Sequence, residues 1–201
     1  MLQSFVQGLA YLQQDRYILT LIVARILMNI GAGLQVLYMG MAEEVLQLGH
    51  YGLGLFAALR GVGFFFGSFM AIKVNSMSSK RCHLLLVLAV LSMGGGFVAL
   101  GLSGMHRWVW LSGLAIVWTF AGAACVTTVS ITLIHHAGRH EFLGRVLAVD
   151  KGFGALAQMT TSLLVGWFLG PQTVVGVALI CGSMLIVAAA LWRRFTAAYW
   201  V

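Results

Sequence analysis

Charged residues are scarce in this chain of 201 residues. Asp, Glu, Lys and Arg make up 8% of it, and only five residues are acidic. Proline occurs once, whereas glycine occurs 25 times and hydrophobic residues reach 61%. Soluble domains carry about 25% charged residues. This composition excludes an ordinary water-soluble core and favours closely packed helices in lipid.

Cysteine is also rare, and its spacing excludes two classes of small domain. Cys82, Cys125 and Cys181 lie far apart, and no CxxC pair occurs. Neither a disulfide framework nor a zinc cluster is therefore indicated. Because no phosphate-binding glycine loop occurs either, we expect no metal and no cofactor.

Long apolar segments fill most of the chain. A helix needs roughly 20 apolar residues to cross about 30 Å of hydrocarbon, because lipid cannot satisfy free backbone groups. Six segments meet this length: Tyr17 to Met39, Tyr51 to Ile72, Leu84 to Gly104, Trp108 to Ile134, Val146 to Leu169 and Val174 to Trp192. The sequence therefore predicts an all-α polytopic membrane protein with six transmembrane helices, forming a single bundle over residues 17–192.

The ends of the chain are more polar. Residues 1–16 place apolar side chains at helical spacing against glutamines, a pattern typical of a short amphipathic helix on a membrane surface. Residues 193–201 form a short tail. We expect both segments to lie in the cytoplasm.

The distribution of Lys and Arg predicts the orientation. Nine of the twelve fall at segment ends on one side of the predicted bundle: Arg16, Lys73, Lys80, Arg81, Arg139, Arg145, Lys151, Arg193 and Arg194. Because short basic loops are retained in the cytoplasm, both termini are expected there. The net charge of +7 thus marks topology and lipid contacts, and we expect no nucleic acid as a partner.

Three local patterns resemble a known family. They are the run Phe5-Val6-Gln7-Gly8-Leu9-Ala10-Tyr11-Leu12 before the first span, Gly144-Arg145-Val146-Leu147-Ala148 at the start of the fifth, and Gly67 with Lys80 and Arg81 after the second. Together they resemble the carboxyl-terminal half of major facilitator superfamily transporters, in the branch of macrolide-efflux and enterobactin-export proteins. The third pattern departs from the family, because Ala71 stands where an acidic residue is usual.

The resemblance implies a fold, a function and a location. Complete family members have about twelve helices in two six-helix halves, with the substrate site between them. The resemblance therefore implies half of a small-molecule exporter in a bacterial inner membrane, working by alternating access. Its partners would be the lipid bilayer, a small-molecule substrate, and an amino-terminal half or a second copy of the chain.

Two arginines lie inside predicted spans. Arg25 shares a helical face with Asn29, and Arg60 lies in the second span. A charge at this depth costs about 2.5 to 3.5 kcal/mol, so both are candidates for a substrate cavity, together with the neutral Gln35 and Gln158. The alternative is that each arginine reaches the interface or bonds backbone carbonyls. All five acidic residues fall at or beyond span ends, so we expect no carboxylate partner for either arginine.

Asp150 lies near basic residues at the predicted cytoplasmic end. Arg145, Lys73 and Arg81 are its candidate partners in an ion pair that breaks as a gate opens, the alternative being a static surface pair. On this basis Asp150→Asn should change transport kinetics and leave membrane levels unchanged. With no acidic residue inside a span, a coupling carboxylate is expected in the other half.

Other functions remain as alternatives. The chain fits a non-transporting remnant of a longer protein, or a small scaffold that binds other helices. A more remote alternative is a rhomboid-like protease, because Gly101-Leu102-Ser103-Gly104 resembles its nucleophile motif. The last span lacks the histidine that such a serine needs as its base, so we expect no enzyme and no catalytic residue.

Two further patterns have simpler interpretations. His135, His136, His140 and Glu141 form the one metal-like cluster, but they lie in a loop beside Arg139, and a solvated loop is favoured. Gly63 and Gly67 have the spacing of a close helix crossing, which favours packing over a hinge.

Overall fold

The structure is a computed structural model that describes residues 15–72, 77–137, 140–170 and 173–196. Within these ranges every regular element is a helix. The expected amphipathic segment (1–16) falls outside them apart from its last two residues, and most of the expected tail (193–201) is outside as well. Side chains are not described for His140 and Glu141.

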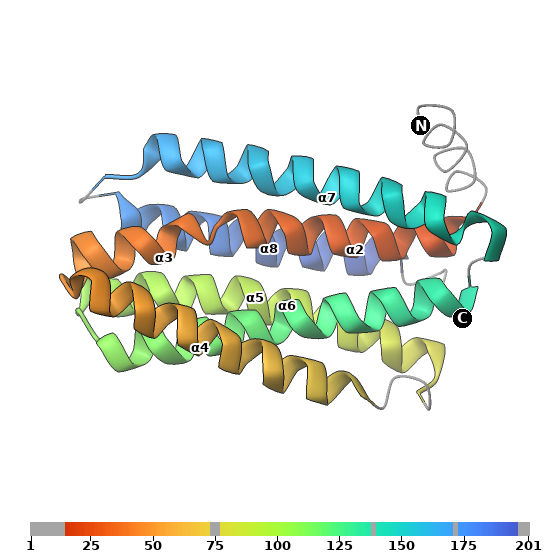
Figure 1. Cartoon of the computed structure of the whole chain (residues 1–201), viewed down its shortest axis with the longest axis horizontal. Helices are drawn as coiled ribbons and strands as arrows, with labels where there is room; N and C mark the ends of the chain where they lie inside the picture. The colour runs from red at the N-terminus through yellow and green to blue at the C-terminus, as the bar shows by residue number, and fades with distance from the viewer. Residues whose placement is uncertain (1–14, 73–76, 138–139, 171–172, 197–201) are drawn as a thin grey trace.

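The helices run up and down in one bundle (Figure 1). The elements in chain order are α2 (Arg16–Gly33), α3 (Val36–Gly40), the π-helical turn η1 (Met41–Val45), α4 (Gly49–Met70), α5 (Ser79–Met105), α6 (Val109–Ala137), α7 (His140–Phe168) and α8 (Val174–Thr196). Figure 1 shows that α2 starts at the end of the bundle where α4, α6 and α8 finish. We call this the basic end, because Arg16, Lys80, Arg81, Arg193 and Arg194 lie at the helix termini there.

Five helical segments are long and apolar enough to cross a membrane within the described ranges. They are Arg16–Val45, Gly49–Met70, Ser79–Met105, Val109–Ala137 and Val174–Thr196. The chain is thus an α-helical membrane protein by this measure. The sixth predicted span is α7, which runs alongside the bundle but does not meet the same criterion; its first half carries Arg145, Asp150 and Lys151.

The core lies around α5. This helix packs against α6 on one side and α8 on the other, and α4 packs on the far side of α6. Phe97, Leu86 and Ile116 are fully buried at these contacts. Large apolar side chains also cover the outer faces, where Trp167 is 87% and Phe65 is 68% exposed. Such surfaces suit lipid rather than water as the surrounding medium.

Close approach of α4 and α6 depends on two glycines. A Cβ at Gly63 would lie 2.6 Å from the carbonyl oxygen of Val117, and a Cβ at Gly67 would overlap the carbonyl of Ala121. Both contacts are to backbone, which cannot move aside as a flexible side chain can. The expected packing role of these glycines is confirmed.

The first span is one apolar segment but not one regular helix. Asp15 caps α2 by accepting hydrogen bonds from the backbone N–H groups of Tyr17 and Ile18. Beyond Gly33 the backbone tightens, because the N–H of Gln35 donates to Ala32 and the N–H of Tyr38 donates to Gln35, three residues back in each case. The segment then loosens into the π-helical turn η1. This irregular stretch places Gln35 and Tyr38 next to α4.

Candidate functional site

A buried ion pair joins α2 and α7 inside the bundle. Nε of Arg25 lies 2.6 Å from Oδ1 of Asp150, and the two side chains are only 3% and 1% exposed. Arg25 is the tenth residue of α2 and Asp150 the eleventh of α7, so both lie about 15 Å from the basic end at 1.5 Å per residue. Their equal depth lets them meet side by side.

Neighbouring groups hold the arginine more completely than the carboxylate. Nη1 of Arg25 lies 3.5 Å from the carbonyl oxygen of Thr127 on α6. Asn29 donates from Nδ2 to the Arg25 carbonyl at 2.8 Å, and its amide packs over Gly154, one turn beyond Asp150. Oδ2 of Asp150, in contrast, is buried and has no hydrogen-bond partner among the described residues. One carboxylate oxygen therefore retains an unused acceptor site.

This pair corrects the expectation that neither intramembrane arginine has a carboxylate partner. That expectation was wrong because the fifth span was started at Val146, which put Asp150 near its end. In the structure α7 begins at His140, so Asp150 lies almost three turns inside the helix. A buried carboxylate therefore lies inside the helical bundle of this chain, paired with Arg25.

The expected gate cluster is not assembled around Asp150 in this structure. Arg145 lies over the ring of Phe142, with its guanidinium carbon 5.3 Å from the ring centroid. Arg81 is exposed on α5, and no ion pair joins either arginine to Asp150 among the described residues. Lys73 lies outside the described ranges. A gating role for Asp150 stays a prediction, with Arg25 as its observed partner.

The second intramembrane arginine has a different environment. Arg60 is exposed on α4 and donates from Nη1 to Oε1 of Gln35 at 3.1 Å. Its guanidinium carbon lies 5.0 Å from the ring centroid of Phe120 and 5.8 Å from that of Phe64. A pocket of about 170 Å³ opens here and is lined by Gln35, Tyr38, Met39, Leu53, Phe56, Ala57, Arg60 and Phe120. We call it the Arg60 pocket.

The five predicted cavity residues thus fall into separate places. Arg25 and Asn29 lie at the ion pair, and Gln35 and Arg60 lie at the Arg60 pocket. Gln158 is half-buried on α7, where its backbone carbonyl packs against Gly33. Sequence reasoning missed Tyr38 and Phe120, which line the pocket. No spacing pattern links these two aromatic residues to Arg60.

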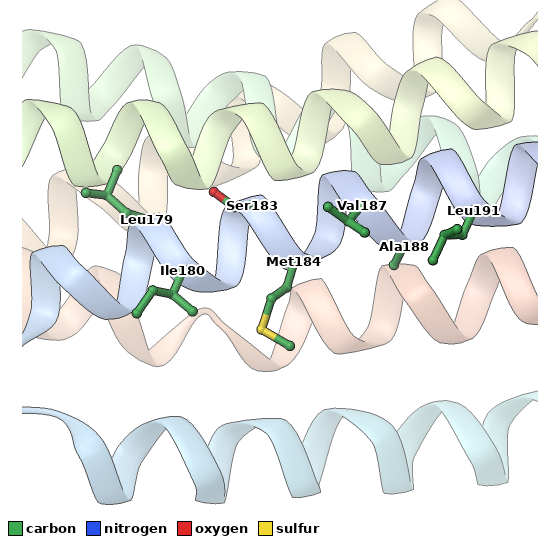
Figure 2. Close-up of a pocket in the computed structure, with 7 residues that line it drawn as sticks. All are labelled: Leu179, Ile180, Ser183, Met184, Val187, Ala188 and Leu191. Atoms are coloured by element: carbon green, nitrogen blue, oxygen red, sulfur yellow. The ribbon is translucent and has the colours of Figure 1, made fainter.

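Two larger hollows are apolar. One, of about 570 Å³, runs between α2, α7 and α8, and Leu27, Leu164 and Met184 are among its lining residues. The other is open and follows a single helix, as Figure 2 shows for Leu179 to Leu191 of α8, with Ser183 as its one polar side chain. Neither contains a charged group. They match lipid-facing surface rather than a chemical site.

Ser103 and the histidine cluster show no arrangement for catalysis or metal binding in the described residues. Ser103 is fully buried, donates to the Leu100 carbonyl at 2.7 Å and lies 2.6 Å from the hydroxyl of Ser112. This links neighbouring helices α5 and α6. His135 and His136 are exposed at the end of α6, and the side chains of His140 and Glu141 lie outside the description, so the metal-like cluster stays untested.

Comparisons of the chain with protein-family models, with curated proteins and with solved structures found no match.

Proposed function

We propose that this chain is half of a membrane transporter that moves a small molecule by alternating access. It requires a second six-helix unit, either an amino-terminal half or another copy of itself. In this proposal α7 is the sixth crossing helix, and the basic end faces the cytoplasm of a bacterial inner membrane, as the concentration of Lys and Arg there favours.

The observation that carries the proposal is the ion pair between Arg25 and Asp150. Ionisable side chains within a membrane bundle are costly and mark the paths of ions and substrates. A purely structural tie of this kind gains little, because well-packed apolar residues often stabilise as well as a buried pair. A charged contact that forms and breaks during a transport cycle explains why two charged residues lie inside the bundle.

In this proposal α7 is the helix that moves. This helix packs mainly against α2, and the apolar groove separates it from α8 on the other side. The ion pair lies within that main interface. In the proposed cycle a tilt of α7 against α2 breaks the ion pair and opens this interface at the basic end.

The requirement for a second unit is tested by the mass of the purified complex in nanodiscs. The proposal predicts a dimer, or a defined complex with a protein of similar size. A chain that remains a monomer in nanodiscs over a range of protein concentrations contradicts the proposal and favours the alternative of a non-transporting remnant of a longer protein.

Alternating access is tested at Ala57, which is exposed in the Arg60 pocket. In a background without Cys82, Cys125 and Cys181, Ala57→Cys is treated with a membrane-impermeant maleimide in right-side-out and in inside-out vesicles. The proposal predicts labelling from both sides.

Two matched controls set the limits of this assay. Arg194→Cys at the basic end should react from one side only, and Leu86→Cys in the core should not react. Labelling of Ala57→Cys from neither side, with both controls as stated, overturns alternating access.

A further inference from the structure

We propose that the Arg60 pocket binds the acidic group of a small aromatic organic anion, and that such anions are the substrate class of the transporter. That these anions are substrates rests on the proposed function, whereas the binding site is argued from the geometry of the pocket alone.

The positive charge of Arg60 is not balanced by a carboxylate among the described residues. Arg25, the other intramembrane arginine, has Asp150 at 2.6 Å. Arg60 has no ion pair among the described residues; its contacts are the neutral Gln35 and two aromatic faces. A guanidinium in a medium of low dielectric binds a carboxylate strongly and often with two parallel hydrogen bonds. The ligand that Arg60 favours is therefore an anion.

The depth of Arg60 in its span distinguishes a lipid headgroup from a small molecule as the source of that anion. Arg60 is the twelfth of the 22 residues of α4, so it lies about 15 Å from either end of the helix at 1.5 Å per residue. Lipid phosphates lie at the two surfaces of the roughly 30 Å core, too far from this position. The anion that reaches Arg60 is one that enters the bundle.

Two side chains lining the pocket can donate hydrogen bonds to an acidic group. Arg60 has further N–H groups besides the one given to Gln35. Gln35 accepts that bond through its oxygen, which leaves its amide NH₂ as a donor. The Tyr38 hydroxyl is fully buried beside the side chain of Thr119, so Tyr38 contributes its ring rather than its hydroxyl to the pocket wall.

The remaining lining of the pocket is apolar, and the rings of Phe56 and Phe120 lie in it beside Met39, Leu53 and Ala57. Phe120 lies between Tyr38 and Phe64, with centroid distances of 5.5 Å and 5.3 Å, and Phe56 completes the wall. Planar rings stack well on such surfaces. Pockets for complete small molecules measure roughly 300 to 1,000 Å³. The 170 Å³ here accommodates one end of a ligand, and the second unit would enclose the rest.

The local backbone supports a cavity at this point. The tightened turns at Gln35 and Tyr38 lie in the second half of the first span, and the π-helical turn that follows ends it. Irregular backbone at membrane depth occurs where it is buried in protein or lines a cavity. Turns of the π type occur frequently at functional sites.

The test uses two probes that differ only in charge, radiolabelled 2-naphthoate and 2-naphthamide. Binding to the full chain in nanodiscs is measured by scintillation proximity, with empty nanodiscs as background. We expect 2-naphthoate to bind at least tenfold more tightly than 2-naphthamide. Arg60→Gln should weaken naphthoate binding by about ten- to hundredfold, the range of a hydrogen bond to a charged group, and leave naphthamide unchanged.

Matched variants keep the result interpretable. Arg194→Gln removes an exposed charge at the basic end and should change neither affinity. Gln35→Leu removes the amide donor at the pocket and keeps the size of a half-buried side chain, so it should fold normally and weaken naphthoate several-fold. It tests the pocket even where Arg60→Gln lowers expression.

Equal binding of the two probes, no binding of either to folded protein, or unchanged naphthoate affinity in both pocket variants overturns the inference. The last two results point to a carboxylate of the second unit as the partner of Arg60. The outcomes are separable from the proposed function. Charge-selective binding without two-sided labelling of Ala57→Cys keeps the site and overturns transport, whereas two-sided labelling without charge selectivity does the reverse.

Discussion

Arg25 and Asp150 lie 125 residues apart in the sequence and 2.6 Å apart in the structure, at the interface where α7 packs on α2. Both are almost completely buried, and the second carboxylate oxygen has no hydrogen-bond partner in the described part of the chain. The two charges therefore compensate each other, while one oxygen of the carboxylate is left without a hydrogen bond.

Asp150→Asn should destabilise the folded protein markedly. The substitution leaves the buried Arg25 guanidinium without its counter-charge, and breaking one side of a buried pair costs about 3 to 5 kcal/mol. This replaces the expectation, based on a surface gate, that Asn would leave membrane levels unchanged. The thermal midpoint in detergent should fall, and the double variant Arg25→Gln with Asp150→Asn should recover part of the loss.

Glu44→Gln is the matched control for this prediction, because it makes the same chemical change at an exposed carboxylate. It should shift the midpoint little. If Asp150→Asn and Glu44→Gln have the same small effect, the pair contributes nothing to stability, contrary to the buried geometry.

Gly67→Ala should push α4 away from α6. The added methyl group overlaps the carbonyl of Ala121, and overpacking of this kind costs typically about 1 to 3 kcal/mol. Gly61→Ala on the same helix has open space around its Cβ and should be neutral. Thermal unfolding of the two variants side by side checks this, and equal midpoints would mean that the crossing is looser than described.

Ser103 should be inert toward fluorophosphonate reagents, which label activated serines. Its hydroxyl is buried and committed to Leu100 and Ser112 rather than to a base. Ser103→Ala should cost about 1 kcal/mol through the lost hydrogen bond. Covalent labelling of the wild-type protein that disappears in Ser103→Ala would instead support the rhomboid-like alternative.

Hydropathy predicted most of the fold because each span is a nearly continuous apolar segment. The boundaries of α4 and α6 lie within a few residues of the predicted spans. The start of α7 was missed because the polar residues His140, Glu141 and Arg145 indicate a loop, although only residues 138 and 139 separate α6 from α7. Polar residues at the end of a span do not tell whether the helix continues through them.

The candidate sites were less predictable. The cost of placing a charge in a span drew attention to Arg25 and Arg60, and both lie within candidate spans of the structure. Their partners depend on how α7 and α2 meet, and on the irregular turn at Gln35, neither of which follows from periodicity along one segment. The equal depth of Arg25 and Asp150 becomes visible only once α7 is seen to begin at His140.

The opening of α7 against α2 is tested most directly by the distance between spin labels on these two helices. Leu19→Cys on α2 and Ala148→Cys on α7 are exposed positions near the basic end, and pulsed electron paramagnetic resonance in nanodiscs measures their separation. An alternating cycle predicts two distance populations, with the longer one enriched when Asp150→Asn removes the ion pair. A single narrow population that is the same in wild type and in Asp150→Asn would contradict it.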